Sequence, residues 1–326
     1  MIAKGKVLIV GEGRKIYSDG YKVYNQDEIL GLVRDRKYAL FSRFLLIRRL
    51  LRAEITGGYL LHDGRILISA KKGLFINSSD DGDFQKVFAI PRGSKPLNLC
   101  ILPNDHIFFG EYFQNMDKQA VNVYSSADYG LTWRVVYTFP KGNINHVHGL
   151  FYDPYTQRIW VLTGDREKEC IIGYTDDEFK TFHVVLRGGQ EYRSCQLFFY
   201  KDFIVYATDS QYMENEIRKI DRNTFEITIL ARIQGSAIKG GQTGNVAYLS
   251  TTVEPSEVNT DRFSHIWVTK DGQNWEDVMR AEKDCFPALF QFGTFEFPQK
   301  AYDNGKLWFS GRALKMFDNK SSYIEI

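Results

Sequence analysis

A degenerate motif that recurs at offsets of 48 and 49 residues constrains the fold of this chain more than any other feature of its sequence. Residues 126–133 read Ser-Ala-Asp-Tyr-Gly-Leu-Thr-Trp, and residues 175–182 read Thr-Asp-Asp-Glu-Phe-Lys-Thr-Phe. Both place a hydroxyl residue two positions before an Asp, and both end in Thr followed by an aromatic residue. Shorter copies occupy residues 78–84 and 269–275, and an eroded copy occupies residues 220–225. Such a period indicates a repeat architecture.

The flanks of the motif repeat as well. A polar turn introduces an apolar strand before the copies, and a further strand leaves each copy. The introduced strands read RILIS, HIFFG, RIWVLTG, FIVYAT and KLWFSG. Each unit therefore contains four short antiparallel strands, with the Asp motif between the third and the fourth. Four antiparallel strands every 45 to 50 residues are typical of a β-propeller blade, and the 15% aromatic content suits a β-rich fold.

This register predicts an all-β fold, in which residues 1–326 form a single β-propeller domain of four-stranded antiparallel blades. Residues 50–326 hold six Asp-box-type blades, so six is the expected number and seven is the alternative. Residues 1–49 form either a degenerate N-terminal blade, with KVLIV and the KIYSDGYKVY hairpin as its strands, or a segment that closes the ring.

The motif resembles the Asp box, Ser/Thr-x-Asp-x-Gly-x-Thr-Trp, of the sialidase-like propellers, which are also called BNR repeats. Residues 126–133 match the box at every position, whereas residues 175–182 carry Phe where the box has Gly and Trp. The resemblance implies the fold but not one function, because the same box occurs in glycosidases, polysaccharide lyases, sorting receptors and assembly factors. We expect the motif carboxylates to form tight turns and exclude them from the site: Asp80, Asp128, Asp177 and Asp271.

Charge and cysteine usage narrow the class of protein. Forty-two Lys and Arg against 40 Asp and Glu give a net charge of +2, which lacks the basic excess that nucleic-acid binding demands. The four cysteines show no C-x-x-C spacing, so we expect free thiols in a reducing, cytoplasmic setting. No apolar run approaches the roughly 20 residues that span a bilayer. We expect no cofactor.

The face opposite the Asp motifs is the expected location of the site. Strands alternate in direction, so this face carries the links into the inner strands and the loops between second and third strands. Charged groups recur at the start of those loops and would line a polar funnel on the propeller axis; Lys71, Lys72, Tyr112 and Glu254 are among them. We assign substrate binding to Arg52, Glu111, Asp165, Arg166, Asp209 and Arg312.

Two stretches that enter inner strands are the candidate catalytic positions. His146 and His148 are two residues apart, which in a strand places both imidazoles on one side, with about 7 Å between their Cα atoms. Tyr192 and Arg193 occupy the corresponding place one blade later. We therefore predict that His146, His148, Tyr192 and Arg193 share one pocket and carry the chemistry. A metal bound between the two histidines would instead make them ligands.

The predicted ligand is an acidic saccharide, and three functions are compatible with it. A glycoside hydrolase would use Glu111 and Asp165 as its carboxylate pair. A polysaccharide lyase would use His148 or Tyr192 as base and acid, with Arg193 neutralising a uronate carboxylate. A non-catalytic propeller would hold a glycan or a protein in the same funnel. Sialidase activity proper is not expected, because the first-arginine motif of that family is absent.

Residues 37–54, KYALFSRFLLIRRLLRAE, concentrate basic and apolar side chains. The simpler interpretation is a strand that runs into the first inner strand. If the segment is helical, it forms a basic amphipathic surface able to contact anionic lipid. Peripheral membrane contact would suit a cytoplasmic factor in envelope-glycan assembly.

Overall fold

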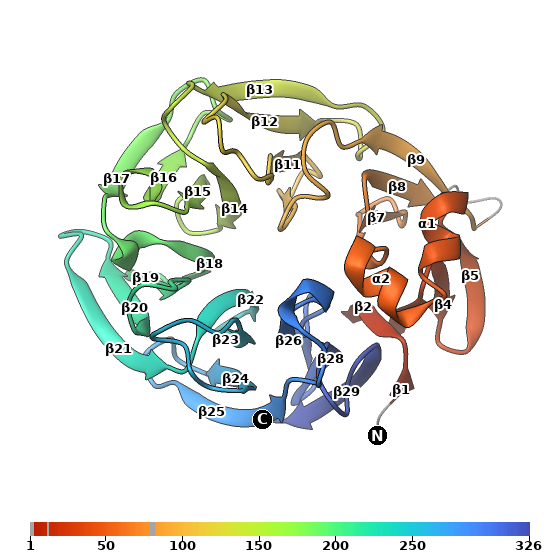
Figure 1. The fold of residues 1–326 in the computed structure, drawn as a ribbon. Helices are drawn as coiled ribbons and strands as arrows, with labels where there is room; N and C mark the ends of the chain where they lie inside the picture. Colours follow the sequence, from red (N-terminus) through yellow and green to blue (C-terminus); the bar gives the residue numbers. More distant parts are fainter. Residues whose placement is uncertain (1–2, 12, 78–81) are drawn as a thin grey trace.

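The computed structural model describes residues 3–11, 13–77 and 82–326, and within them the strands form six antiparallel sheets around a central axis (Figure 1). Five sheets have four strands each. They are β2 (Lys6–Gly11), β3 (Arg14–Asp19), β4 (Lys22–Asn25) and β5 (Glu28–Leu32); β6 (Ile55–Leu60), β7 (Ile66–Ala70), β8 (Gly73–Asn77) and β9 (Phe84–Ala89); β10 (Cys100–Ile101), β11 (Ile107–Gly110), β12 (Val121–Ser126) and β13 (Arg134–Phe139); β14 (His146–Asp153), β15 (Arg158–Gly164), β16 (Ile171–Thr175) and β17 (His183–Arg187); β18 (Ser194–Phe199), β19 (Phe203–Thr208), β20 (Asn215–Asp221) and β21 (Ile227–Ile233).

The remaining sheet has nine strands and contains two four-stranded units. The first unit is β22 (Ser236–Thr243), β23 (Val246–Val253), β24 (Phe263–Thr269) and β25 (Glu276–Glu282). The second is β26 (Gly293–Glu296), β28 (Lys306–Arg312), β29 (Lys320–Glu325) and β1 (Ala3–Lys4), with β27 (Tyr302–Asp303) beside β28. Pairing of β23 with β26 at Thr252 and Thr294 joins the two units. The predicted propeller of four-stranded antiparallel blades is therefore confirmed.

The described strands thus make seven four-stranded units in six hydrogen-bonded sheets. The expected six matches the number of sheets, and the alternative of seven matches the number of units. The KVLIV run forms β2, and the KIYSDGYKVY hairpin forms β3 and β4. The ring closes where β1 pairs with β29, through the register Ala3 with Ser321 and Lys4 with Lys320.

The core lies between neighbouring sheets, because the inner strands of each unit are covered on both faces. Strand β11 shows this: all four of its residues are buried. Its Phe108 packs with Leu150 of β14 and with Phe179 in the next sheet's hairpin. The outer strands β9 and β13 each contain several exposed residues. The continuous apolar runs in the sequence are strands buried on both faces, as their composition predicts.

The Asp motifs lie in the hairpins between third and fourth strands, as predicted. In the β12–β13 hairpin, Ser126 Oγ donates to Asp128 Oδ1 (2.8 Å), and Thr132 N donates to the same oxygen (2.9 Å). The β16–β17 hairpin repeats both bonds with Thr175, Asp177 and Thr181. Phe179 there has φ 73°, close to the 84° of Gly130 in the first hairpin. The copy at residues 78–84, with Asp80, lies largely outside the described residues.

Two short helices occupy the segment before β6, so the strand interpretation of residues 37–54 is wrong. Helix α1 spans Arg36–Phe41 and α2 spans Leu45–Leu51. Asp35 caps α1 by accepting a hydrogen bond from Tyr38 N. Three 3₁₀ turns complete the elements: η1 (Glu167–Glu169), η2 (Gln190–Tyr192) and η3 (Ala288–Phe290). Among the described residues, no helix is long and apolar enough to cross a bilayer.

Candidate functional site

A cavity of about 500 Å³ lies on the propeller axis, at the face that carries the links into the inner strands. Sequence reasoning placed the site on this face, and several residues that it selected line the cavity. These are Arg52, Tyr112, His146, Asp165, Arg193, Asp209, Glu254 and Arg312. They come from the loops or strand ends of six different four-stranded units, so the cavity exists only when the ring is assembled.

The two histidines meet at one carboxylate. His146 and His148 are 5% and 2% exposed, and their Nε2 atoms are 3.1 Å apart. Asp165 Oδ1 lies 3.1 Å from His148 Nε2 and 3.4 Å from His146 Nε2. The other ring nitrogens face backbone carbonyls: His146 Nδ1 is 3.0 Å from Phe113 O, and His148 Nδ1 is 3.0 Å from Ser194 O. Asp165 is partly buried, which opposes its ionisation, but the two imidazoles outweigh this effect and hold its pKa well below the ordinary value.

Arg193 links this cluster to a second carboxylate. Its Nη2 lies 3.1 Å from Asp165 Oδ1, and its Nε lies 3.6 Å from Asp209 Oδ2. The flanking carboxylates outweigh the effect of burial and raise the pKa of Arg193, so the guanidinium stays charged. Cys195 donates from Sγ to Asp209 Oδ2 at 3.3 Å, and burial raises the pKa of this thiol well above its ordinary range. Three of the four predicted catalytic residues therefore share one cluster.

Tyr192, the fourth predicted catalytic residue, does not join them. The turn η2 precedes β18, and consecutive side chains point in opposite directions there: Arg193 points to the axis, and Tyr192 packs between sheets against a cluster that includes Trp160 and Leu162. The tyrosine that lies beside the two histidines is Tyr112. Its ring centroid lies 4.3 Å from that of His146 and 6.3 Å from that of His148. Burial raises the pKa of Tyr112, so its hydroxyl stays protonated.

Two predicted substrate-binding residues also lie outside the cavity lining. Glu111 is 2% exposed and forms an ion pair with Arg92, whose Nε donates at 2.9 Å; its other oxygen accepts from Asn122 N. Both carboxylate oxygens of Glu111 therefore accept hydrogen bonds from other residues of the propeller. Arg166 begins the η1 turn through its carbonyl, which accepts from Glu169 N, and its side chain is exposed. A charged residue at the start of a loop therefore does not by itself define a site.

The opposite wall of the cavity is basic, and sequence reasoning missed half of it. Arg312 Nη1 lies 3.1 Å from Glu296 Oε1 and 3.6 Å from Glu54 Oε1, and Lys6 Nζ lies 2.7 Å from Glu296 Oε2. Lys95 and Lys239 line the same wall. Within the described chain, neither ammonium has a recorded hydrogen bond or ion pair. The overlooked signal was a lysine inside an inner strand, in the β22 sequence SAIKGGQT.

Burial and the positive charges of this wall lower the pKa values of its lysines. Burial lowers the pKa of Lys239 to about 8, and Arg312 contributes to the shift. Burial also lowers the pKa of Lys95, as do the neighbouring charges of Lys239 and Arg312. Across the cavity, burial and the nearby Asp209 raise the pKa of Glu254 to about 7. The site therefore disfavours additional positive charge on one wall and additional negative charge at Glu254.

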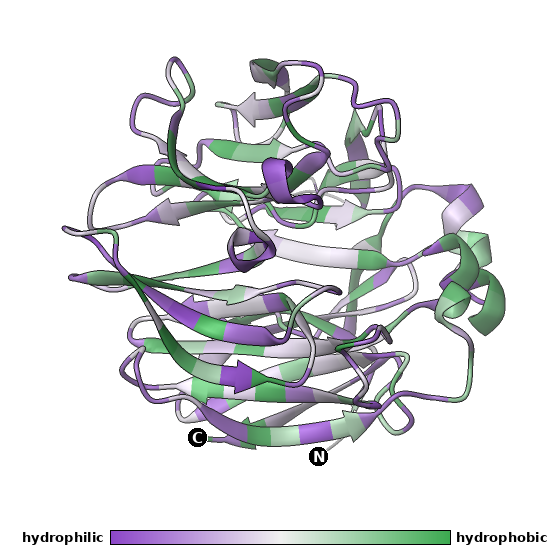
Figure 2. Cartoon of the chain, turned by 60° about the vertical axis from the view of Figure 1, so that its left-hand side comes forward, coloured by the Kyte–Doolittle hydropathy of each residue, from purple (hydrophilic) through white to green (hydrophobic). Residues whose placement is uncertain are grey.

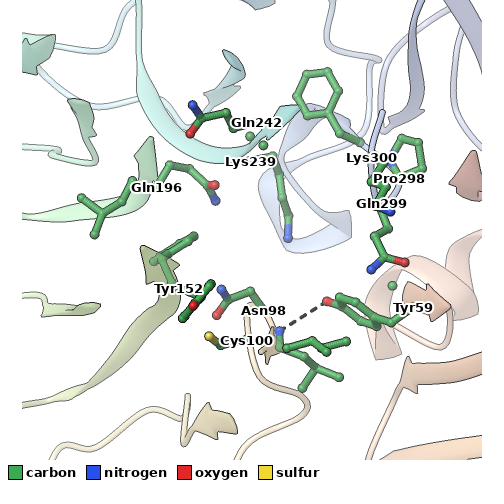
Figure 3. Close-up of a pocket in the computed structure, with 18 of the residues that line it drawn as sticks. Tyr59, Asn98, Cys100, Tyr152, Gln196, Lys239, Gln242, Pro298, Gln299 and Lys300 are labelled. Atoms are coloured by element: carbon green, nitrogen blue, oxygen red, sulfur yellow. Dashed lines mark hydrogen bonds between the residues drawn. The ribbon is translucent and has the colours of Figure 1, made fainter. Parts of the chain in front are cut away.

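A second cavity, of about 700 Å³, occupies the other end of the axis and shares Leu97 and Lys239 with the first. Figure 3 shows this space with Asn98, Gln196, Gln242 and Gln299 around it, and with Lys239 near its centre, where the two cavities meet. Those amides are bonded to backbone. Gln242 Oε1 accepts from Phe199 N (2.7 Å), and Gln299 Oε1 accepts from Leu60 N (2.8 Å). At this end of the axis, side-chain hydrogen bonds therefore connect neighbouring inner strands.

No family model and no curated protein matches this sequence. Solved structures do match it. The structure titled "Crystal Structure of Mitotic Checkpoint Complex" has a TM-score of 0.57 at 9% identity, over 100% of this chain and 91% of that one. The WD40 β-propeller domain of Doa1 has a TM-score of 0.56 at 10% identity, over 99% and 95%. A GH74 enzyme of Niastella koreensis has a TM-score of 0.53 at 13% identity, over 85% of this chain and 46% of that one. At these identities the likeness shows the fold alone, and the chain is a β-propeller.

Proposed function

We propose that this chain is a sialidase-like, carbohydrate-active propeller that binds an acidic glycan in the axial cavity opposite the Asp boxes. The pair of unpaired ammonium groups at Lys95 and Lys239 is the observation that carries the proposal. Taking a charged group out of water is costly unless it gains a partner. Two lysines without recorded partners, both lining one cavity, are therefore suited to an anion supplied by a ligand.

The charge balance of the lining supports an anionic ligand. Five cationic side chains line the cavity, against three carboxylates. One of those carboxylates is Glu254, whose raised pKa leaves it only partly ionised near neutral pH. A uronate or sialate carboxylate placed between Lys95 and Lys239 would relieve their mutual repulsion. Arg312 is held by Glu296 and Glu54, so it adds to the potential without being free to pair with the ligand.

The rest of the lining suits a sugar better than a small inorganic anion. Aromatic rings of Tyr112, Phe113 and Phe292 offer faces for pyranose C–H groups, and Gln114 and Asn145 offer amides for hydroxyls. The Asp-box resemblance and the structural likeness to the GH74 enzyme favour the same ligand class. Both are fold-level analogies and carry less weight than the lysines.

Turnover of the bound glycan is a second candidate function, and Glu254 is the observation that favours it. A carboxyl group with a pKa near 7 is suited to general acid catalysis at neutral pH. Glu254 lines the cavity, and Gln211 Nε2 donates to its Oε1. Asp165 lines the same cavity, whereas Glu111 is engaged by the scaffold. Glu254 therefore replaces Glu111 in the carboxylate pair of a hydrolase.

Binding is best tested with matched ligands that differ only in the carboxylate. Uronate oligosaccharides and sialosides would be titrated calorimetrically beside their methyl esters, which keep the sugar and remove the charge. We expect the acids to bind and the esters to bind at least 10-fold more weakly. The double variant Lys95→Ala/Lys239→Ala should lower affinity by about 100-fold or more, since hydrogen bonds to charged groups contribute about 1.5–3 kcal/mol each.

The control is Lys141→Ala, which removes an exposed lysine from the β13–β14 link. Equal affinity for acid and ester, or full affinity in the double variant, would contradict the proposal. The same ligands separate the functions. New absorbance near 235 nm would indicate elimination, new reducing ends without it would indicate hydrolysis, and binding without either would leave a non-catalytic glycan module.

A further inference from the structure

The imidazole pair has a geometry that glycan binding does not explain. His146 and His148 leave β14 on the same side of the strand, beside a register shift between Val147 and Gly149. Both rings are buried, and both turn their Nε2 atoms toward Asp165 Oδ1. We propose that His146, His148 and Asp165 form a binding site for a divalent transition-metal ion of the zinc class.

The hydrogen bonds of the Nδ1 atoms set the chemistry of the Nε2 atoms. A backbone carbonyl only accepts, so the contacts of His146 Nδ1 with Phe113 O and of His148 Nδ1 with Ser194 O favour a proton on each Nδ1. Asn145 Nδ2 also lies 3.3 Å from His146 Nδ1, which is longer than the 3.0 Å contact with the carbonyl. In neutral rings each Nε2 then carries a lone pair. Two nitrogen lone pairs and one carboxylate oxygen converge within 3.1–3.4 Å of one another. Lone pairs this close repel one another, so a cation among them would stabilise the arrangement.

The three separations fit a metal ion as that cation. Bonds of about 2.0–2.1 Å with angles between about 90° and 109° separate neighbouring ligand atoms by about 2.8–3.4 Å. The observed values of 3.1, 3.1 and 3.4 Å lie in that range. A proton, by contrast, bridges only two of the three atoms, such as the two Nε2 atoms, and Asp165 Oδ1 is then contacted by Arg193 Nη2 at 3.1 Å. Two imidazoles and one carboxylate favour zinc, iron or cobalt over calcium and magnesium, which prefer oxygen ligands.

The surroundings complete the arrangement of a metal site. Metal-binding histidines commonly donate their second nitrogen to a carbonyl, which fixes the ring and its tautomer; both rings do so here. Asn145 Nδ2 donates to Asp165 Oδ2 at 2.9 Å and orients the carboxylate. Asp165 and Asp209 together offset the charge of Arg193 beside the site. His146 and Asp165 line the axial cavity, so a fourth coordination position would open toward the ligand.

Metal binding can be tested on the purified chain without any glycan. After dialysis against a chelator, the chain would be titrated with ZnSO₄ and with CoCl₂, whose visible spectrum reports coordination by nitrogen ligands. We expect one ion per chain. His148→Ala should weaken affinity by at least about 100-fold, because it removes a ligand rather than an outer-shell partner. His183→Ala, an exposed histidine on β17, should leave affinity unchanged.

His148 is buried, so His148→Ala can also fail to fold. X-ray absorption of the Co²⁺ or Zn²⁺ form of the unmodified chain avoids this difficulty and should show two imidazoles in the first shell. A folded wild-type chain that binds neither ion at stoichiometric concentration would overturn the proposal, and so would unchanged affinity in a folded His148→Ala variant. A proton held between the two imidazoles, with Arg193 paired to Asp165, would then account for the geometry.

The second inference concerns α2, whose polar and apolar sides are reversed. The arginines face the protein: Arg48 Nη2 lies 2.7 Å from Asp318 Oδ2, and Arg49 forms ion pairs with Asp318 and Asp284. Most large aliphatic residues of α1, α2 and the turn between them face away from it, whereas Tyr38 and Ala39 pack against the core. Six of these side chains are 39–54% exposed, namely Leu40, Phe44, Leu45, Leu46, Ile47 and Leu50. Figure 2 shows the two helices protruding from the propeller, green over much of their length and purple or pale elsewhere.

Positive charge surrounds this apolar face. Arg36, Lys37, Arg43 and Arg52 are exposed, and within residues 33–54, all of which the structure describes, no acidic side chain is exposed. Leu289 of the neighbouring turn η3 is 69% exposed and extends the apolar face, since η3 contacts α2. Large apolar side chains within a basic rim complement an anionic lipid surface, in which the apolar groups insert and the cations meet the headgroups.

The geometry points to an anionic bilayer as the occupant of this face, which we call the helical face (residues 36–52 and 288–290). Arg52 ends α2 and also lines the axial cavity. The helical face and the cavity mouth therefore lie on the same side of the propeller. A bilayer bound there would hold the mouth close to glycans that carry lipid anchors.

Vesicle co-sedimentation tests this assignment. The chain should bind vesicles of equal parts phosphatidylcholine and phosphatidylglycerol at least 10-fold better than pure phosphatidylcholine, and salt should weaken binding because charge contributes. The triple variant Phe44→Ser/Leu46→Ser/Ile47→Ser should lose binding and keep its melting temperature, since these side chains are exposed. The matched control Met116→Ser/Tyr212→Ser removes two other exposed apolar groups.

Binding that survives the triple variant, or equal binding to both vesicle types, would overturn the lipid assignment. Binding to neither vesicle type would do the same. If an acidic amphipathic peptide then bound the wild-type chain and not the triple variant, the helical face would be assigned to a protein partner instead.

Discussion

The two ends of the propeller axis differ in how their polar side chains are used. At the end that carries the Asp-motif hairpins, polar groups bond to nearby backbone: Asp128 and Asp177 close hairpins, and Gln242 and Gln299 tie one inner strand to the next. At the other end, Lys95 and Lys239 face a cavity with no recorded partner within the described chain, and His146 and His148 turn lone pairs toward one carboxylate. One end satisfies its own hydrogen bonds, and the other leaves them for a ligand.

This difference separates the residues that recur in several units from the residues that occur in one unit only. The Asp-motif hairpins repeat because each one closes the same kind of turn between a third and a fourth strand. The residues of the opposite end differ from unit to unit, since a single cavity at the axis needs each unit to supply a different group. Stability and binding should therefore respond to different sets of substitutions, and four variants test that separation.

Trp133→Ala should have the largest effect on stability. The Trp133 ring packs against Phe88 and Phe109, with centroids 5.8 and 5.2 Å away, and its Nε1 donates to Gly130 O. The side chain is only partly buried, so the loss should fall near the lower end of the usual range, at about 3 kcal/mol. Urea denaturation would measure it. Affinity for an acidic oligosaccharide should stay unchanged, and a stable variant that no longer binds would break the comparison.

Asp128→Ala should have a smaller effect of the same kind. The Asp128 carboxylate accepts from Ser126, from Thr132 N and from Thr132 Oγ1. Loss of such a turn-closing group costs about 1–2 kcal/mol. Thermal and urea unfolding should both report it. A matched Asp177→Ala variant should lose a similar amount, since its hairpin has the same bonds, and a large difference between the two would show that the hairpins are not equivalent.

Lys239→Met, at the cavity end, should weaken ligand binding without lowering stability. The folded pKa of about 8 lies below the ordinary 10.5, so the charged form is disfavoured in the folded state. This penalty is fully present below pH 8 and disappears above pH 10.5. The variant should therefore unfold with an unchanged or slightly higher free energy at pH 7, while binding the acidic ligand more weakly. A clear loss of stability would show that Lys239 is a structural residue.

Glu254→Gln should give the smallest effect, visible as a change in pH dependence. The folded pKa of about 7 lies above the ordinary 4.5, so ionisation of Glu254 costs folded-state stability. That cost appears as the pH rises from about 4.5 to about 7. Stability curves at pH 5 and pH 8 should differ less in Glu254→Gln than in the wild-type chain. An identical difference in both proteins would remove Glu254 from the set of buried, perturbed carboxyls.

The fold could be predicted from the sequence because it follows from local patterns that occur many times. The motif occurs in five copies, so each copy was supported by four others, even where Phe179 replaced Gly. The cavity could be predicted only in part. His146 and His148 are two residues apart in β14, so strand periodicity predicted that they share one side. It did not predict that Asp165, which follows β15, would join them. Tyr192 and Arg193 differ by one residue, and no local pattern decided which of the two would face the axis.

Residues far from any motif were harder to find. Lys95 follows β9 in an irregular link, and Lys239 sits within an inner strand beside a register shift at Ala237. Their convergence depends on the closure of the whole ring. Residues 37–54 failed for a different reason. The burial of Arg48 and Arg49 depends on Asp284 and Asp318, which lie more than 200 residues away, so sequence periodicity alone could not show which side of the helix is outward.

The pairing of β1 with β29 has a consequence for biosynthesis. Of the described strands, β1 leaves the ribosome first and β29 last, so the two edges that close the ring stay open throughout elongation. Val7 N donates to the hydroxyls of Ser310 and Ser321, and Ser321 Oγ donates to Gly5 O, so several bonds form only at this final step. Until then an unpaired edge is available to another nascent chain, and two chains on one polysome could exchange their first strands. Ring closure is thus the step at which a chaperone, or slow translation of the final residues, would most affect the yield of correctly closed rings.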